Sequence, residues 1–329
     1  MKFSVIIPVY NRPDEVDELL HSLILQQDAQ FEVIVVEDGS TVPCKEIVDS
    51  YASRLDIHYF SKPNSGPGQS RNYGAERSTG DYLIILDSDC ILPEGYFEAV
   101  GKALQATPAD AFGGPDRAHE SFTSTQKAIN YSMTSFFTTG GIRGGKKKMD
   151  KFYPRSFNMG IRRDVYEALG GFSDMRFGED IDFSIRIFKG GYACRLFSGA
   201  WVYHKRRADL KKFFKQVHNS GIARINLYKK YPESLKPVHV LPAVFTIGAG
   251  VFLSGAVFCP YGLLPIVCYA VLVAADASIR SKSLAIGLLS VAASFVQLLG
   301  YGTGFLRAWW QRCVLGNDAF SAFNKNFYK

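Results

Sequence analysis

Short apolar runs alternate with amphipathic helical patterns through the first hundred residues of the chain. The runs have the length of buried strands and lie at residues 3–8, 31–36, 56–60 and 82–86. Between them, apolar periodicity and turn residues predict helices at 14–26, 45–54 and 69–78. This repeated strand–helix order predicts an α/β fold with a mostly parallel sheet and helices on both faces.

A different pattern begins near residue 118. An apolar, amphipathic run at 122–137 leads into a glycine-rich basic loop at 138–148, and helical patterns return at 166–171 and 180–189. We therefore expect one large domain over residues 1–237, with residues 118–155 as an insertion close to a membrane or a substrate.

The last third of the chain contains long stretches without charge. Residues 241–275 and 283–306 include no charged side chain, and about 20 apolar residues suffice to cross a membrane. Pro260 and Gly262 divide the first stretch, which predicts a membrane hairpin followed by a third apolar helix. We expect two or three membrane helices at 238–308 and a tail at 309–329. The alternative is a soluble helical subdomain that is buried on all sides.

The charge pattern orients these segments. Residues 3–8 already form a strand rather than a signal peptide, so we expect the large domain to face the cytosol at the inner (cytoplasmic) membrane. Positive side chains, which mark the cytosolic side, flank both ends of the hairpin: Lys205, Arg206, Arg207, Lys211, Lys212, Lys215, Arg280 and Lys282. Arg307 and Arg312 follow the third segment, and Trp309 and Trp310 suit a membrane interface. Whether the third segment spans the membrane, is tilted, is re-entrant or lies at the interface therefore stays open.

Composition and charge limit the classes of binding partner that we expect. The chain is 47% hydrophobic and 21% charged, with a formal net charge of +7 that is concentrated next to the apolar segments. No recognition helix or RNA-binding signature accompanies this charge, so we expect an anionic membrane surface as partner and no nucleic acid. The six cysteines lack the paired spacing of a metal site, which favours reduced thiols over a disulfide framework.

Two acids end the strand predicted at 82–86. Asp87 and Asp89 follow directly after this apolar run, with Ser88 between them. At the carboxyl end of a parallel strand, such a pair can hold a divalent cation against a substrate diphosphate. The alternative is a pair of solvated turn acids. Other polar side chains also follow predicted strands: Tyr10, Asn11, Glu37 and Asp38.

Four ordered strings together resemble the family-2 glycosyltransferases, inverting enzymes with the Rossmann-like GT-A fold. The strings are VIIPVYN at 5–11, VVEDGS at 35–40, LDSD at 86–89 and GEDID at 178–182. The resemblance covers roughly residues 1–230 and implies a nucleotide-sugar donor. In this reading Asp38, beside Glu37, accepts a hydrogen bond from uracil, which favours a UDP-sugar. Pro8, Tyr10 and Asn11 line the base pocket, and Arg71 and Asn72 contact the base or the diphosphate.

The same resemblance assigns the metal and the catalytic base. It implies that Asp87 and Asp89 place Mn²⁺ or Mg²⁺ on the diphosphate, with Asp89 as the direct ligand. Asp180 matches the family's base, and Glu179 orients the base or the acceptor; the alternative for both acids is an acidic helix start. Some related enzymes take a third metal ligand from a downstream histidine, here His204, although a structural histidine fits this position equally.

The acceptor follows from the membrane segments. The Gln-x-x-Arg-Trp string of processive family members is absent, which favours transfer of a single sugar to a lipid-linked saccharide in surface polysaccharide or glycan assembly. The alternative acceptor is a bare polyprenyl phosphate. In either case the basic loop side chains Arg143, Lys146, Lys147 and Lys148 are candidates to neutralise the lipid phosphate, or they contact bulk anionic lipid.

Two other classes of function stay as remote alternatives. A sugar nucleotidyltransferase usually has a glycine-rich loop after its first strand, but residues 9–13 contain no glycine. A catalytically silent membrane adaptor would have lost acids that are all present here.

Overall fold

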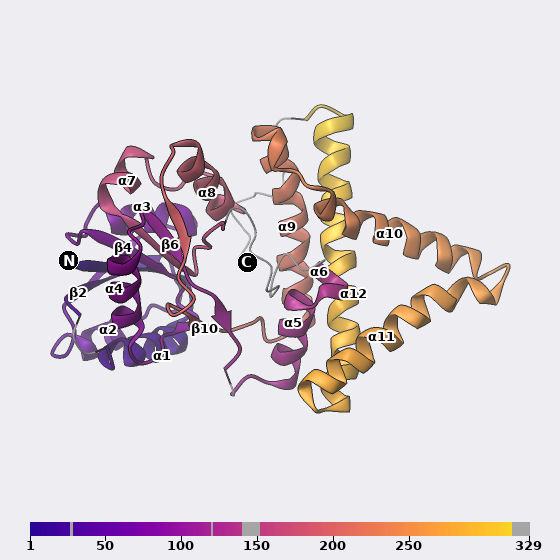
Figure 1. Ribbon diagram of the computed structural model, residues 1–329, viewed down its shortest axis with the longest axis horizontal. Coiled ribbons are helices and arrows are strands. Elements are labelled where there is room, and N and C mark those ends of the chain that lie inside the picture. The colour runs from indigo at the N-terminus through magenta and orange to yellow at the C-terminus, as the bar shows by residue number, and fades with distance from the viewer. Residues whose placement is uncertain (27–28, 120, 140–151, 318–329) are drawn as a thin grey trace. The chain divides into compact units, whose positions relative to one another are not determined.

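The computed structural model describes residues 1–26, 29–119, 121–139 and 152–317, and it contains two compact units. The first unit comprises residues 1–119 and 149–205, and the second comprises residues 120–148 and 206–329. Figure 1 shows the elements of both units. The domain boundaries expected at residues 237 and 308 stay predictions.

A seven-stranded sheet forms the centre of the first unit. Its strand order is β3-β2-β1-β4-β8-β6-β9. The bounds are β1 Phe3–Val9, β2 Phe31–Asp38, β3 Ile57–Lys62, β4 Tyr82–Leu86, β6 Ala111–Gly113, β8 Asn158–Arg162 and β9 Cys194–Leu196. The first four strands pair in parallel, whereas β8 runs antiparallel to both β4 and β6. The expected mostly parallel α/β fold is therefore confirmed, with one antiparallel strand inside the sheet.

Alternating side chains of each strand enter two different cores. Val5 and Ile7 of β1 belong to one fully buried cluster, and Ile6 between them belongs to the other. Three helices cover the first face: α1 Pro13–Ile24, α2 Lys45–Tyr51 and α4 Tyr96–Ala106. Three others cover the second face: α3 Pro67–Ala75, α7 Arg163–Ala168 and α8 Glu179–Lys189. Covering both faces explains why these strands are continuous apolar runs rather than alternating ones.

A small second sheet extends this unit at the carboxyl end of β4. It contains β5 Cys90–Ile91, β10 Val202–His204 and β7 Asp116–Arg117, in the order β5-β10-β7. In this sheet His204 pairs with Cys90, so a residue more than a hundred positions downstream lies next to the acids that follow β4.

The second unit is helical. Its elements are α5 Ser124–Thr134, α6 Phe136–Thr139, α9 Leu210–Lys230, η1 Pro232–Ser234, α10 Pro237–Gly255, η2 Pro260–Leu263, α11 Leu264–Ser281, α12 Leu284–Trp309 and η3 Trp310–Val314. Three segments are long and apolar enough to cross a membrane: Pro237–Gly255, Pro260–Ser281 and Leu284–Val314.

The apolar run expected as an insertion, at residues 122–137, belongs to this helical unit. Ala128 and Ile129 of α5 pack in one cluster with Phe213 of α9 and Ala293 of α12. Tyr131 of α5 also donates a hydrogen bond of 2.6 Å to Asp276 of α11. The described part of this run therefore packs in the helical core of the second unit.

Candidate active site

The carboxyl ends of β1, β2 and β4 meet at one edge of the large sheet, because these strands are neighbours and run in parallel. Each strand is followed by side chains that the sequence marks as candidates. Asn11 follows β1, Asp38 ends β2, and Asp87 follows β4. The helix α3, which carries Arg71, begins at the same edge after β3. The fold thus gathers the expected donor-site residues in one place.

Arg71 connects two of the acidic motifs. Its guanidinium donates hydrogen bonds to Asp87 Oδ1 at 2.7 Å and to Glu179 Oε1 at 3.1 Å, and it lies over the ring of Phe172. The residue is 2% exposed. Burial opposes its charged form, but Asp87 and Glu179 together raise the pKa of Arg71 above its ordinary value. Arg71 therefore stays a cation that holds the strand-end acid beside the helix that carries Glu179.

Glu179 and Asp180 begin α8, directly after Gly178. Both residues are buried. Burial and the neighbouring Asp180 raise the pKa of Glu179 to about 7, because they outweigh the opposing effect of Arg71. Asp180 is paired differently: its Oδ2 lies 2.6 Å from Nε of Arg155, whose side chain is 37% exposed. Asp182, two residues further, is fully buried and accepts hydrogen bonds from Ser173 and Arg186, which gives it a structural role.

Asp89 lies against a histidine and an arginine. His204 Nε2 is 3.2 Å from Asp89 Oδ1, and Arg12 donates to Asp89 Oδ2 at 2.6 Å. The imidazole stacks on Phe157, with ring centroids 4.6 Å apart. Asp89, Cys90 and His204 offer ligand atoms that all lie within 4.8 Å of one another.

This group fits a divalent cation. Nε2 of His204 faces the Asp89 carboxylate, and a carboxylate with an imidazole is a donor set that Mn²⁺ accepts. Burial raises the pKa of the Cys90 thiol well above its usual value, and the thiol donates instead to the carbonyl of Phe157. The available ligands are therefore Asp89 and His204. Asp87 is not in this group of three, and its Oδ1 accepts a hydrogen bond from Arg71.

Asp38 organises the turn before α3. Its carboxylate accepts hydrogen bonds from the amides of Ser65 at 2.9 Å and Gly66 at 2.8 Å, and it forms an ion pair with Lys62. Gly66 has a φ of 95°, a conformation that L side chains rarely adopt. The base-recognition candidate thus sits 3% exposed at the start of the helix that carries Arg71.

Three other donor-site candidates make internal hydrogen bonds. Asn11, which has a φ of 52°, accepts from the amides of Thr41 and Val42 through Oδ1. Glu37 accepts from Ser40, Cys44 and Tyr59, and Asn72 accepts from Tyr166 and Phe172. These hydrogen bonds hold the three side chains in place, and their contact with a donor stays a prediction. Pro8 and Tyr10 are half-buried, and Ser88 is buried.

The expected lipid-phosphate contacts, Arg143, Lys146, Lys147 and Lys148, lie outside the described residues. Conversely, three site cations were missed in the sequence: Arg12, Lys62 and Arg155, which pair with Asp89, Asp38 and Asp180. Arg12 directly follows a recognised string, so its position was a usable signal. Arg155 had no such signal, because only the tertiary fold brings it to α8.

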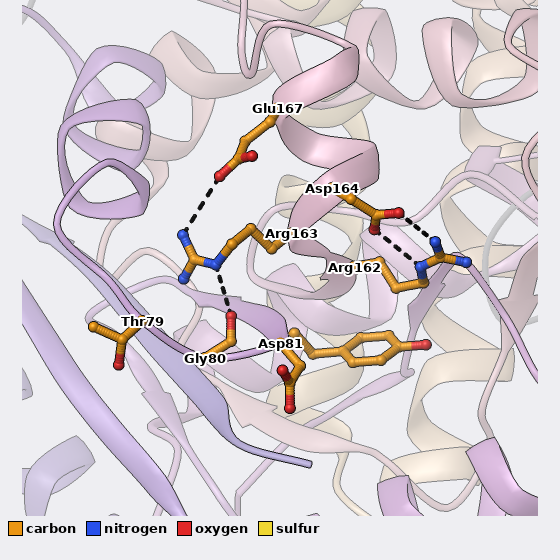
Figure 2. Close-up of a pocket in the computed structure, with 8 residues that line it drawn as sticks. Thr79, Gly80, Asp81, Arg162, Arg163, Asp164 and Glu167 are labelled. Atoms are coloured by element: carbon orange, nitrogen blue, oxygen red, sulfur yellow. Dashed lines mark hydrogen bonds and ion pairs between the residues drawn. The ribbon is translucent and has the colours of Figure 1, made fainter.

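A hollow of about 380 Å³ lies at the opposite end of β4 (Figure 2). Tyr82, where β4 begins, lines it together with Arg163 and Glu167. Arg163 is held there by the carbonyl of Gly80 at 2.8 Å and by Glu167 at 3.7 Å. This hollow is separated from the strand-end acids by the length of the strand, and its two arginines, Arg162 and Arg163, pair with Asp164 and Glu167.

Comparison with known proteins agrees with this geometry. The model of the family described as Glycosyl transferase family 2 matches residues 4–170, just over half of the 329 residues. Glycosyltransferase AglE of Haloferax volcanii is 26% identical over 250 residues, which is 74% of this chain and 80% of that protein. Three uncharacterized glycosyltransferases of Rickettsia species are 41–44% identical, but this chain covers only 13–22% of their length.

Two solved structures share the fold. The mannosyltransferase PcManGT from Pyrobaculum calidifontis, in complex with GDP-Man and Mn²⁺, has a TM-score of 0.62 and 17% identity, over 94% of this chain and 87% of that one. S. aureus TarS 1-349, in complex with UDP-GlcNAc, has a TM-score of 0.50 and 18% identity, over 96% and 93%. With the family model matching the strands and acids of this edge, the chain belongs to glycosyl transferase family 2 and has the GT-A fold.

Proposed function

We propose that this protein transfers a single sugar, with inversion, from a nucleotide-sugar to a hydroxyl of a lipid-linked saccharide. The observation that carries the proposal is the buried bridge from Asp87 through Arg71 to Glu179. It joins the acid expected at the donor diphosphate to the helix start that carries the expected base. Donor and acceptor chemistry would then share one site, as a direct displacement requires.

The donor diphosphate fits the edge where β4 ends. Asp89 and His204 would hold a divalent cation there, and Asp87 would support it. Such a cation, when bound, stabilises the negative charge of the departing nucleoside diphosphate. Arg71 lies close enough to Asp87 to contribute positive charge to the same region.

Asp180 would act as the general base. In the proposed step the acceptor oxygen forms a bond to the anomeric carbon while the bond from that carbon to the diphosphate oxygen breaks. The acceptor hydroxyl proton passes to the Asp180 carboxylate, and the nucleoside diphosphate leaves with the bonding electron pair. Arg155, which pairs with Asp180, would keep this carboxylate oriented, and Glu179 would orient the acceptor.

The membrane segments support a lipid-linked acceptor. Three helices have the length and composition to enter a bilayer, so an acceptor carried by lipid would meet the enzyme at the membrane surface. We place the catalytic domain on the cytosolic side because positive charges flank the hairpin. The basic loop with Arg143 and Lys146–Lys148 would bind the lipid phosphate, and the product would serve surface polysaccharide or glycan assembly.

A polyprenyl phosphate is the second candidate acceptor. Its phosphate oxygen is already ionised and needs no base, so the Asp180→Asn variant distinguishes the two. This substitution should abolish transfer to a saccharide hydroxyl but largely spare transfer to a phosphate.

The test is release of nucleoside diphosphate by the detergent-purified protein. A panel of UDP- and GDP-sugars covers both donor types bound by the fold neighbours, with Mn²⁺, Mg²⁺ or a chelator and with membrane lipid extract as acceptor. We expect one UDP-sugar to turn over only with metal. Asp89→Asn should lose activity together with metal binding, whereas Asp180→Asn should lose activity and keep donor binding. If no donor were turned over and none were bound, the proposal would be contradicted and a catalytically silent membrane adaptor would be favoured.

A further inference from the structure

The unpartnered part of the second unit is the end of the α10–α11 hairpin. From Gly250 to Val267 the side chains are uncharged, mostly apolar and mostly exposed, with Val257 82% and Phe258 91% exposed. Figure 1 shows α10 and α11 leaving α12 and meeting at their shared turn. Because this surface is apolar all round and no charge occurs from residue 241 to 275, lipid hydrocarbon is the occupant that fits it.

Most backbone amides of the turn between the two helices are paired with nearby carbonyls. The amides of Val257, Phe258 and Cys259 donate to carbonyls of residues 254 and 255, at 3.0–3.3 Å. The amide of Gly262 donates to Cys259, and Pro260 has no amide hydrogen to satisfy. In water, unpaired amides of a turn can bond to solvent. In hydrocarbon the amides must be paired within the protein, because each unpaired amide there costs several kcal/mol.

The hairpin projects only a short way beyond α12. Ala243 of α10 packs with Phe305, and Thr246 donates to the carbonyl of Leu298 at 3.4 Å. On the other arm, Tyr269 of α11 contacts Phe295. Residues 247–255, which follow Thr246, then add about 14 Å at the rise of an α-helix. One leaflet of hydrocarbon is about 15 Å deep, so this length suits entry into one leaflet rather than a full crossing.

The third apolar helix lies along a charged one. Arg312, just after α12, contacts Asn226 of α9, and Gly304 of α12 lies against the backbone of His218. Over this length α9 carries cationic side chains: Lys211, Lys212, Lys215, Arg224, Lys229 and Lys230. If α12 crossed the bilayer, it would draw these charges into hydrocarbon at high cost. A third of the most apolar window of α12 is also buried inside the molecule, against 11% for the other two segments.

We propose that α10 and α11 form a re-entrant wedge. Both arms enter the bilayer from the face that carries their charged ends, and the turn at residues 256–263 stays within hydrocarbon. The helices α9 and α12 then lie together along that same membrane surface, with the lysines of α9 toward the anionic head groups. The protein is thus anchored in one leaflet, and none of the described residues crosses the bilayer.

Native cysteines make the test direct, because Cys259 is in the turn and Cys313 follows α12, and both are exposed. One full-length variant keeps Cys259 (Cys194→Ala, Cys268→Ala and Cys313→Ala), and its matched partner keeps Cys313 and carries Cys259→Ala instead. Each is exposed to a charged, membrane-impermeant maleimide in sealed right-side-out and inverted vesicles. Cleavage by added trypsin shows on which side of the vesicle membrane the GT-A domain lies, and donor binding verifies that each variant is folded.

We expect Cys259 to react roughly tenfold or more slowly than Cys313 from both sides, and to react fully after unfolding in SDS, because hydrocarbon excludes a charged reagent. Cys313 should react from the side of the GT-A domain. Reaction of Cys259 from the opposite side would show a crossing hairpin, and rapid reaction from the near side would show that the wedge stays out of the bilayer. Reaction of Cys313 from the opposite side would show that α12 crosses. Each of these three results would overturn the proposal.

Discussion

A single buried cation, Arg71, compensates two acids of different motifs. Asp87 and Glu179 accept its two hydrogen bonds, and neither lies close to the other in sequence. Its loss would leave the buried Glu179 and the partly exposed Asp87 without this partner, which is more costly than the loss of an exposed ion pair.

We therefore expect Arg71→Gln to lower the free energy of unfolding by about 3–5 kcal/mol and to weaken donor binding. Arg71→Lys should recover part of the stability, because it keeps the charge but cannot donate to both acids in a planar fork. The measurements are thermal unfolding in detergent and donor titration. Arg77→Gln, at a half-exposed arginine two residues beyond α3, is the control and should change stability by less than about 1 kcal/mol. Equal effects at both positions would contradict the bridging role.

The raised pKa of Glu179 predicts a pH-dependent stability. Between its ordinary value of 4.5 and about 7, the folded protein binds more protons at this group than the unfolded chain. The contribution of Glu179 is therefore complete below about pH 4.5 and is lost as the pH rises to about 7, by up to about 3 kcal/mol. Melting temperatures of wild type and Glu179→Gln should converge at low pH and diverge in favour of the variant above pH 7. Glu167→Gln, at an exposed glutamate, is the control. If the melting temperatures of wild type and Glu179→Gln differed by the same amount at every pH, the raised pKa of Glu179 would be excluded.

At the scale of elements, glycine controls how α9 and α12 meet. A Cβ at Gly304 would lie 2.0 Å from the carbonyl oxygen of His218, and one at Gly221 would lie 2.2 Å from that of Tyr301. Real Cβ atoms do not approach backbone so closely, so the helices would have to separate. The close packing lets a polar helix cover one side of an apolar one.

Gly304→Ala should therefore destabilise the second unit by about 1–3 kcal/mol, the usual cost of overpacking. Gly248→Ala in α10 is the matched control, because a Cβ there meets nothing within 4 Å. It should be neutral or stabilising by up to about 1 kcal/mol, since alanine favours a helix over glycine. Thermal unfolding of both variants in the same detergent gives the comparison, and a neutral Gly304→Ala would mean that the two helices do not pack this tightly.

The elements of the sheet show where sequence patterns reach their limit. The predicted strand at 82–86 agrees with β4 in full, and α1, α2, α3 and α8 were predicted within a few residues. β5, β6, β7, β9 and β10 have two or three residues each, too few for periodicity to detect. β8 was also missed, although its pairing with β4 and β6 completes the sheet.

At the scale of the whole molecule, removing part of the α9–α12 core and removing the end of the α10–α11 hairpin should have different effects. A chain that ends at residue 231 loses α12 and exposes the apolar side chains that pack on it, including Phe213 and Val217. We expect this truncated chain to aggregate rather than become a soluble enzyme, because a large apolar face is left uncovered. Gel filtration and yield of soluble protein give the measurement.

Replacing only residues 248–266 with a short Gly-Ser linker should preserve the fold, because Phe245 and Tyr269 already lie 5.4 Å apart, ring to ring. This variant should keep donor turnover but leave vesicles at about 1 M salt, where charge attraction is screened. The wild type should remain bound through its apolar wedge. Flotation with anionic vesicles is the measurement, and salt-resistant binding of the variant would show that α12 itself is inserted.

The sequence alone determined the family, the α/β class, the acids at the strand ends and the three apolar helices. These features depend on local periodicity and on short strings, which a chain carries whatever its tertiary contacts. Only the tertiary structure placed His204 beside Asp89, Arg155 beside Asp180 and α5 against α12. Those contacts join segments that are far apart in the chain, and they form only when strand pairing and helix packing bury the side chains between them.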